Sequence, residues 1–149
     1  MQLSDVIRPT NVLCNVSAAN KGKLLHALAS KVSQGLDVSE EAIFDALDRR
    51  ESLGSTGIGL GIAVPHATIS ELTDIVILVC RLSKAIDFDA IDGEPVELIF
   101  LLLVPDNRKS EYLTILAAIA RHMRADGVLE AIRKADTADQ IYIALTDGR

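Results

Sequence analysis

Two apolar runs rich in β-branched residues stand out in the middle of the chain, at residues 74–82 and 96–104. The second is the longest apolar stretch of the sequence, and Glu97 is its one charged residue. Runs of this kind are typical of strands buried at the centre of a sheet. The Asp-Gly-Glu-Pro sequence at 92–95 supplies a turn between them, and a shorter β-leaning segment occupies residues 11–16.

Apolar residues at helical spacing predict three long helices, at residues 19–34, 39–52 and 109–124. Gly35 and Gly127 are expected to end the first and the last of these, and Ser39 to cap the second. A final helix is expected from Thr137, whose pairing with Gln140 fits a capping box. Because helices alternate with strands, the predicted fold class is α/β, with helices covering the sheet.

Length and composition predict a single domain over residues 1–149. A chain of 149 residues with 49% hydrophobic content can bury a core without the help of metals or disulfides. No repeat and no Pro/Gly/Ser-rich linker divides the sequence. No apolar run reaches the roughly 18 to 20 residues that cross a bilayer, so membrane insertion is not expected.

The net charge and the two cysteines indicate the cellular compartment of the protein and the class of its binding partners. A formal net charge of -6 and the absence of Trp argue against a nucleic-acid binder, which needs clustered cations or aromatic stacking platforms. The first residues lack a basic stretch followed by an apolar one, so no secretory signal is expected. Cys14 and Cys80 lie in apolar, strand-like runs and are expected to be buried, reduced thiols. These features predict a cytoplasmic protein whose partner is another protein or a small molecule.

Residues 54–61 hold four of the nine glycines. Phosphate-binding loops also use glycine, but a P-loop needs Lys and then Ser or Thr after its last glycine, and Leu60 follows Gly59 here. The dinucleotide fingerprint needs a glycine where Ile62 stands, and this segment leads into a strand-like Ile-Ala-Val instead of a helix. Nucleotide binding is therefore not expected, and no cofactor is predicted.

The glycines instead give a permissive backbone leading to His66, and Pro65 limits the approach to its imidazole. A lone histidine beside a turn is more often a structural residue. Two features favour function here, because the glycine N–H groups and the double arginine Arg49-Arg50 are suited to meet an anion attached to the ring. The arginines also have an alternative role, in which they compensate the helix dipole or pair with neighbouring carboxylates.

A neutral imidazole, with a pKa of about 6.5, offers one ring nitrogen as a nucleophile while the other hydrogen-bonds an orienting group. It can attack phosphorus without a separate general base, and Arg or N–H donors stabilise the transferring group.

The other two histidines are not expected to be functional. His26 is interpreted as a partly exposed structural residue, and His122 as solvated or capping. The histidines and cysteines share no zinc-ligand spacing, so no metal site is predicted, and no Gly-x-Ser-x-Gly hydrolase elbow occurs.

Residues 50–66 carry the longest motif of the chain, Arg-Glu followed by Gly-Ser-Thr-Gly-Ile-Gly and Gly-Ile-Ala-Val-Pro-His. It closely resembles the signature of the enzyme IIA domains of the fructose/mannitol class of the bacterial phosphoenolpyruvate:sugar phosphotransferase system. The resemblance covers nearly the whole chain, including the opening Leu-Ser-Asp-Val-Ile and the late Tyr-Leu-Thr-Ile-Leu-Ala-Ala-Ile-Ala. The Ser-Thr-Gly-Ile-Gly form on a stand-alone domain looks most like the nitrogen-regulatory branch, IIA-Ntr.

The resemblance implies a mixed β-sheet flanked by helices on both faces. It also implies that His66 takes a phosphoryl group on Nε2 from a histidine-phosphorylated carrier of the HPr or NPr type, and that Arg50 contacts that group. A further segment is implied to border the phosphoryl pocket: Ser55, Thr56 and Gly57.

The sequence departs from the family pattern at Tyr112, where family members commonly carry a second active-site histidine. The tyrosine hydroxyl can still hydrogen-bond the phosphoryl group.

From the resemblance as a whole, we expect a phosphohistidine carrier that acts as a nitrogen-linked regulator of target proteins. The alternatives are a sugar-specific enzyme IIA that passes phosphate to a IIB domain for fructose or mannitol uptake, a non-catalytic interaction module of the same fold, and, least supported, a small-molecule enzyme with His66 as general base. The first expectation for the donor's docking face is an apolar patch around the glycine-rich loop.

Overall fold

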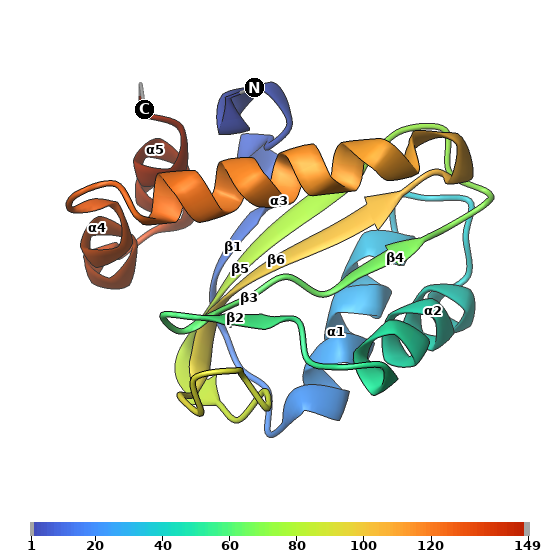
Figure 1. Ribbon diagram of the computed structural model, residues 1–149, viewed down its shortest axis with the longest axis horizontal. Coiled ribbons are helices and arrows are strands. Elements are labelled where there is room, and N and C mark those ends of the chain that lie inside the picture. Colours follow the sequence, from blue (N-terminus) through green and yellow to red (C-terminus); the bar gives the residue numbers. More distant parts are fainter. Residues whose placement is uncertain (1, 148–149) are drawn as a thin grey trace.

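The two apolar runs form antiparallel neighbours at the centre of a mixed sheet, as β5 (Val76–Ile86) and β6 (Val96–Val104). The computed structural model describes residues 2–147, and its sheet contains six strands in that range (Figure 1). β1 (Val12–Val16) pairs with β5 in parallel and forms one edge. The central strands are therefore where the sequence predicts them, although β5 continues four residues beyond its expected end at 82.

The glycine-rich segment supplies three short strands, β2 (Gly57–Gly59), β3 (Ile62–Ala63) and β4 (His66–Thr68). β3 and β4 follow one another along β6, both parallel to it, and β2 pairs with β3 in antiparallel fashion. Leu60 and Gly61, between β2 and β3, both have positive φ, at 60° and 77°. Positive φ at both positions of a two-residue loop is the geometry of a tight hairpin.

Helices cover both faces of the sheet (Figure 1). One face carries α1 (Lys21–Ser33) and α2 (Glu40–Ser52). The other carries the long α3 (Lys109–Met123) together with α4 (Val128–Lys134) and α5 (Ala138–Thr146). The predicted architecture, a mixed sheet flanked by helices on both faces, is confirmed. Short 3-10 helices occupy Leu3–Asp5, Pro9–Asn11 and Asp106–Arg108.

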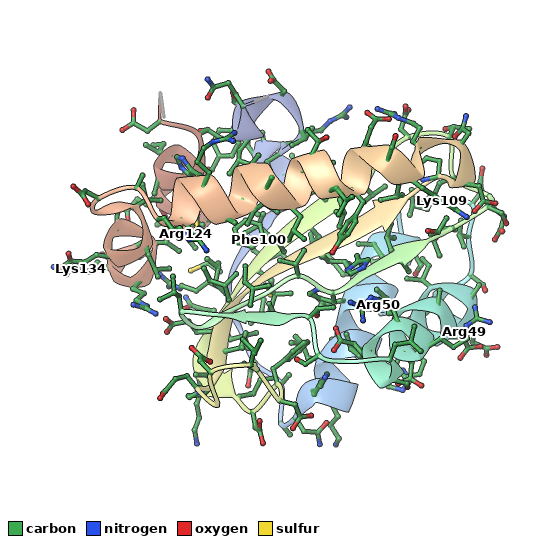
Figure 2. The ribbon with its side chains drawn as sticks, in the orientation of Figure 1. Arg49, Arg50, Phe100, Lys109, Arg124 and Lys134 are labelled. Carbon is green, nitrogen blue, oxygen red and sulfur yellow. The ribbon has the colours of Figure 1, made fainter. Side chains whose placement is uncertain are left out.

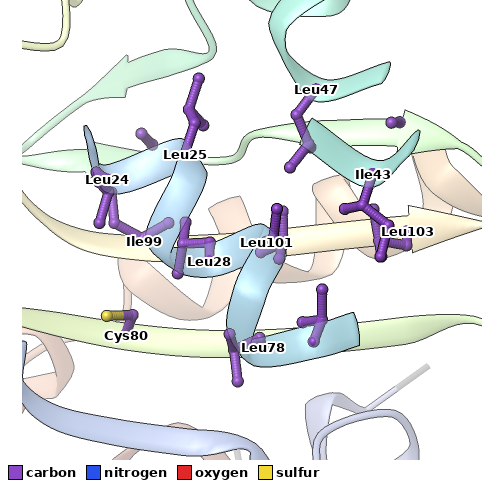
Figure 3. Close-up of a cluster of buried hydrophobic side chains, with 14 of the residues drawn as sticks. Leu24, Leu25, Leu28, Ile43, Leu47, Leu78, Cys80, Ile99, Leu101 and Leu103 are labelled. Carbon is purple, nitrogen blue, oxygen red and sulfur yellow. The ribbon is translucent and has the colours of Figure 1, made fainter. Parts of the chain in front are cut away.

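The central strands divide their side chains between two cores, because successive residues of a strand point to opposite faces. Toward α1 and α2, one set of side chains from strands and helices packs together (Figure 3): Leu24, Leu28, Ile43, Leu47, Leu78, Ile99 and Leu101. Toward α3 and α5 the alternate set does so: Ile77, Leu98, Phe100, Leu102, Ile115, Ile119 and Ile141. This double burial explains why residues 96–104 are almost entirely apolar.

Two predicted helix starts are confirmed by their capping hydrogen bonds. The Ser39 hydroxyl accepts from the backbone N–H of Ala42 at 3.1 Å, and the Thr137 hydroxyl accepts from the N–H of Gln140 at 3.2 Å. The capping box predicted at Thr137 is incomplete, because the Gln140 side chain accepts from the N–H of Asp136, at 2.6 Å, instead of from Thr137. The first helix starts two residues later than predicted, after the cap Asn20.

α4 was not predicted. Gly127 has a φ of 80° and turns the chain directly into this helix, whose seven residues are too few to show a helical period. The two thiols, Cys14 and Cys80, are free as expected, although Cys14 is only half-buried. Burial raises the pKa of the Cys80 thiol to about 12. Within residues 2–147, no helix combines the length and the apolar character needed to cross a bilayer.

Candidate functional site

His66 opens β4 and lies beside Leu102, toward the carboxyl end of β6. β4 packs against α2, so the last turn of that helix faces the imidazole. The ring is half-buried and borders a pocket of about 320 Å³. Residues of α2 and β4 complete the lining of this pocket: Ala46, Arg49, Arg50, Leu53, Ala67 and Thr68. The imidazole is therefore accessible from outside.

Hydrogen bonds hold both ring nitrogens of His66. Nδ1 lies 3.0 Å from the carbonyl oxygen of Val64, and Nε2 accepts from Nε of Arg50 at 3.1 Å. A carbonyl only accepts and a guanidinium only donates, so the proton of the neutral ring belongs on Nδ1. The lone pair of the ring therefore sits on Nε2 and faces the pocket side of α2.

Arg50 is fixed by a second hydrogen bond, from Nη1 to the carbonyl oxygen of Gly54 at 2.9 Å. Figure 2 shows Arg50 directed from α2 toward β4, while Arg49 projects from the outer side of the helix. Arg49 also lines the pocket, but its side chain is exposed. Spacing alone left the two arginines equivalent, whereas the family resemblance singled out Arg50. In the structure it is Arg50 that reaches the imidazole.

Tyr112 of α3 stacks on the other side of His66. The centroids of the two rings are 4.1 Å apart and their planes meet at 24°. The tyrosine ring covers a face of the imidazole and shields it from water, while Arg50 meets the edge that carries Nε2. Burial also raises the pKa of the Tyr112 phenol, an effect that the charge of Arg50 partly offsets, so the hydroxyl stays protonated.

The surroundings of His66 lower its pKa below the ordinary value. Burial is the largest cause; the hydrogen bond to Val64 raises the pKa, the charge of Arg50 lowers it, and that of Glu51 raises it. A lowered pKa keeps the ring neutral at pH 7, where its lone pair is free to act as a nucleophile. The site is therefore a neutral imidazole next to a fixed cation.

The segment expected to border the phosphoryl pocket turns its side chains elsewhere. Ser55 donates its hydroxyl to the carbonyl of Phe88 at 2.6 Å and accepts from the N–H of Gly57 at 3.0 Å. Thr56 is buried, and its hydroxyl and its N–H both donate to the Glu51 carboxylate. None of these side chains is among those that line the pocket beside His66.

Gly57 packs too closely against Ala90 to carry a side chain. A Cβ atom there would lie 2.8 Å from the Cβ of Ala90, so no larger residue fits without a backbone shift. The side chains of Ser55 and Thr56 thus support the loop in this structure, and the prediction that residues 55–57 border the phosphoryl pocket stays a prediction.

Sequence reasoning missed Glu51 as part of this support. Ile43, Leu47 and Glu51 follow one another at a spacing of four residues, so the helix places a carboxylate on its own buried stripe. The sequence spacing alone could therefore have indicated that Glu51 is buried. The partner of Glu51 was not readable, because it is Lys21, thirty residues earlier in the chain and with its Nζ 2.8 Å away from the carboxylate.

The other two histidines lie outside the site. His26 is exposed and stacks on Phe44, with ring centroids 3.6 Å apart. His122, expected to be solvated or capping, is buried instead, and its Nε2 lies 3.0 Å from the carbonyl of Ala144, near the end of α5. Among residues 2–147, no group of three histidine, cysteine or acidic side chains is arranged to hold a metal ion.

Comparison with known proteins adds the family. Residues 5–148 match the model of the family described as "Phosphoenolpyruvate-dependent sugar phosphotransferase system, EIIA 2". The chain is 37% identical over 145 residues to the nitrogen regulatory protein of Bradyrhizobium diazoefficiens, an alignment that covers 97% of this chain and 95% of the relative.

Solved structures agree with this match. The nitrogen regulatory protein IIA-Ntr of Neisseria meningitidis superimposes with a TM-score of 0.90 at 28% identity, covering 97% of this chain and 99% of the other. The mannitol enzyme IIA of Escherichia coli, in its complex with phosphorylated enzyme IIB, shares the fold, with a TM-score of 0.80 at 20% identity over 96% and 98% of the two chains. The chain therefore belongs to the EIIA 2 family of the phosphoenolpyruvate-dependent sugar phosphotransferase system, and it is a phosphotransfer component.

Proposed function

We propose that the protein carries a phosphoryl group on Nε2 of His66 and acts as a nitrogen-linked regulator. One observation carries the proposal: Nδ1 is committed to the Val64 carbonyl, while Nε2 presents its lone pair beside the guanidinium of Arg50. A nucleophile and a cation that stabilises the transferring group thus stand on the same side of the ring.

In the transfer step, the Nε2 lone pair forms a bond to phosphorus as the bond between phosphorus and the donor's histidine nitrogen breaks. The electron pair of the broken bond returns to the donor imidazole. The Nδ1 proton of His66 stays in place, hydrogen-bonded to Val64, so no general base is needed. Arg50 keeps its Nε–H proton and redirects that hydrogen bond from the ring nitrogen to a phosphoryl oxygen, while its bond to Gly54 holds the guanidinium in place.

The donor is proposed to be a histidine-phosphorylated protein of the HPr or NPr type, docking on the apolar surface around the site. Leu53, at the pocket, and Leu113, next to Tyr112, are 85% and 66% exposed. Farther along α3, a second hollow of about 200 Å³ joins that helix to the glycine-rich hairpin through Ile58, Leu60, Leu116 and Ala120. Of these apolar side chains, Leu53, Ile58, Leu60 and Leu113 are exposed, and exposed apolar patches are characteristic of protein interfaces. Such a donor and two free thiols suit the cytoplasm, where we place the protein.

The regulatory role rests on the relatives, several of which are nitrogen regulatory proteins that match over nearly their whole length. Phosphorylation adds nearly two negative charges at His66, so partners that contact this face distinguish the two forms. Transfer onward to a IIB domain is the alternative, favoured by the mannitol enzyme IIA that was solved with phosphorylated IIB. A membrane permease gene next to the gene for this chain would favour that alternative.

The test is phosphorylation by a phosphorylated HPr-type carrier, followed by mass spectrometry of the intact protein and of its peptides. The wild-type chain and a His26→Ala variant are expected to take up one phosphoryl group, since His26 lies outside the site. A His66→Ala variant is expected to take up none. Equal uptake by the His66→Ala variant would refute the proposal, and failure of the wild type to take up label would favour a non-catalytic module.

A further inference from the structure

Glu51 places a charge in the protein interior, one residue after Arg50. It is 8% exposed, and among residues 2–147 it is one of three buried polar or charged residues, with Thr56 and His122. An ionised carboxylate withdrawn from water is costly unless other groups pair with it and hydrogen-bond it. The partners of Glu51 therefore have to be accounted for.

Two residues satisfy this carboxylate. Thr56 donates its N–H, at 3.3 Å, and its hydroxyl. Lys21, the first residue of α1, places Nζ 2.8 Å from Oε2. The same ammonium lies 4.6 Å from the centroid of the Phe88 ring and donates to the Phe88 carbonyl at 3.4 Å. We call Lys21, Glu51 and Thr56 the Glu51 cluster; it joins α1, α2 and the glycine-rich segment.

A hydrogen-bonded path leads from the Glu51 cluster to Nδ1 of His66. The carbonyl of Thr56 accepts from the N–H of Val64 at 2.9 Å, and the carbonyl of Val64 lies 3.0 Å from Nδ1. Val64, whose carbonyl sets the tautomer of the imidazole, is thus held through its N–H by Thr56, and Thr56 is held by the Glu51 carboxylate.

A second path leads to Arg50 and so to Nε2. Arg50 donates from Nη1 to the carbonyl of Gly54, and the N–H of Gly54 donates to the Glu51 carbonyl at 3.1 Å. The partners of both ring nitrogens therefore depend on residues 54–56, which the Glu51 carboxylate anchors at Thr56.

We propose that the Glu51 cluster is a positioning unit in which the Lys21–Glu51 ion pair fixes residues 54–56, and through them the Nδ1–H tautomer of His66 and the placement of Arg50. The Lys21, Glu51 and Thr56 side chains act through Val64, Gly54 and Arg50 rather than on the phosphoryl group itself. The part of the inference that concerns the transfer rate rests on the proposed function.

The ion pair makes a specific prediction, because each partner removed alone leaves the other short of compensation. Without Lys21, protonation of the Glu51 carboxylate or its rotation toward water becomes favourable, and either change releases Thr56. Without the Glu51 charge, the half-buried Lys21 ammonium keeps the Phe88 carbonyl and the more distant Asp89 carboxylate, whose Oδ2 lies 3.9 Å away. Removing both charges together restores neutrality, so the double variant is expected to perform better than the single ones.

The experiment compares Lys21→Met, Glu51→Gln and the double variant with wild type, and uses Lys23→Met as a matched control on the exposed side of α1. We expect Lys21→Met to slow phosphoryl transfer to His66 by about tenfold to a hundredfold, since displacements near 1 Å have effects of that size. The double variant is expected to recover a large part of the rate, and Lys23→Met to stay near wild type. Melting temperatures are recorded throughout, and the neutral, near-isosteric Thr56→Val replaces any single variant that fails to fold.

A second readout does not depend on phosphorylation. ¹⁵N NMR of the His66 ring is expected to show the Nδ1–H tautomer in wild type and in Lys23→Met, and a mixture of tautomers in Lys21→Met and Glu51→Gln. In Glu51→Gln the pKa of His66 is also expected to fall, because the charge of Glu51 raises it. Unchanged ring spectra in every folded variant, or a double variant as slow as the product of the single effects, would overturn the inference. If wild type takes up no phosphoryl group, the proposed function fails, and the ring spectra still decide this inference.

Discussion

An Arg50→Met substitution removes the cation nearest the reacting nitrogen and keeps a long side chain in its place. The guanidinium of Arg50 lies 3.1 Å from Nε2 of His66 and is held by a second bond of 2.9 Å to Gly54. It is therefore already in position before charge develops on the phosphoryl oxygens. Loss of one such preorganised donor lowers rates by about 10²–10³, equivalent to roughly 2.7–4 kcal/mol. We expect the transfer rate of Arg50→Met to fall by that amount.

The rate is measured by rapid quenching with a phosphorylated HPr-type carrier, at a pH above the ordinary histidine pKa. That choice matters because the charge of Arg50 lowers the pKa of His66, so the substitution on its own raises it. Arg49→Met is the matched control, the same chemical change one residue earlier on an exposed side chain. An exposed charge is worth at most about 1 kcal/mol, so Arg49→Met should stay within about fivefold of wild type. Equal rates for the two variants would refute the role given to Arg50.

Three further predictions concern the ring and the core. Tyr112→Ala uncovers His66 and should raise the pKa of His66 toward the ordinary value, whereas Tyr112→Phe should leave it lowered. NMR titration of the His66 ring measures both, and identical titration curves for the two variants would contradict the shielding role of Tyr112. The pKa of His66 is lower in the folded than in the unfolded chain, so the unfolded chain binds the proton more readily. The contribution of His66 to the unfolding free energy is therefore complete above about pH 6.5 and is lost as the pH falls through the folded-state pKa. Over that range, urea unfolding should show a steeper fall of the unfolding free energy with falling pH in wild type than in His66→Gln. Phe100→Ala should lower the unfolding free energy by about 3–5 kcal/mol, against less than about 0.5 kcal/mol for the exposed Leu113→Ala, and similar urea midpoints would contradict the packing described.

The central fold was readable from the sequence because its signals are long and local. Residues 96–104 are apolar except for Glu97, since both faces of β6 are covered, and the caps at Ser39 and Thr137 lie within three residues of their partners. Of the short strands, β3 was indicated by the strand-like Ile-Ala-Val at 62–64, whereas β2 and β4 were not readable. Three residues carry no period, and β4 pairs with β6, far along the chain. The assignment of residues 1–149 to a single domain stays a prediction.

The site divides in the same way. His66 and the arginine motif lie close together in the sequence, and the structure brings His66 and Arg50 into contact. The stacking of Tyr112 depends on how α3 crosses the sheet, which no local pattern specifies. The hydroxyl of Thr56, expected near the pocket, turns inward because the buried Glu51 needs donors. The roles of these residues in phosphoryl transfer stay predictions.

The central claim is that the Val64 carbonyl occupies Nδ1 of His66 and leaves Nε2 to carry the phosphoryl group. The direct measurement is ¹⁵N and ³¹P NMR of protein with labelled histidine rings after phosphorylation by the carrier. We expect phosphorus to couple to Nε2 of His66 while Nδ1 keeps its proton. A phosphoryl group found on Nδ1, or on His26 or His122, would contradict it.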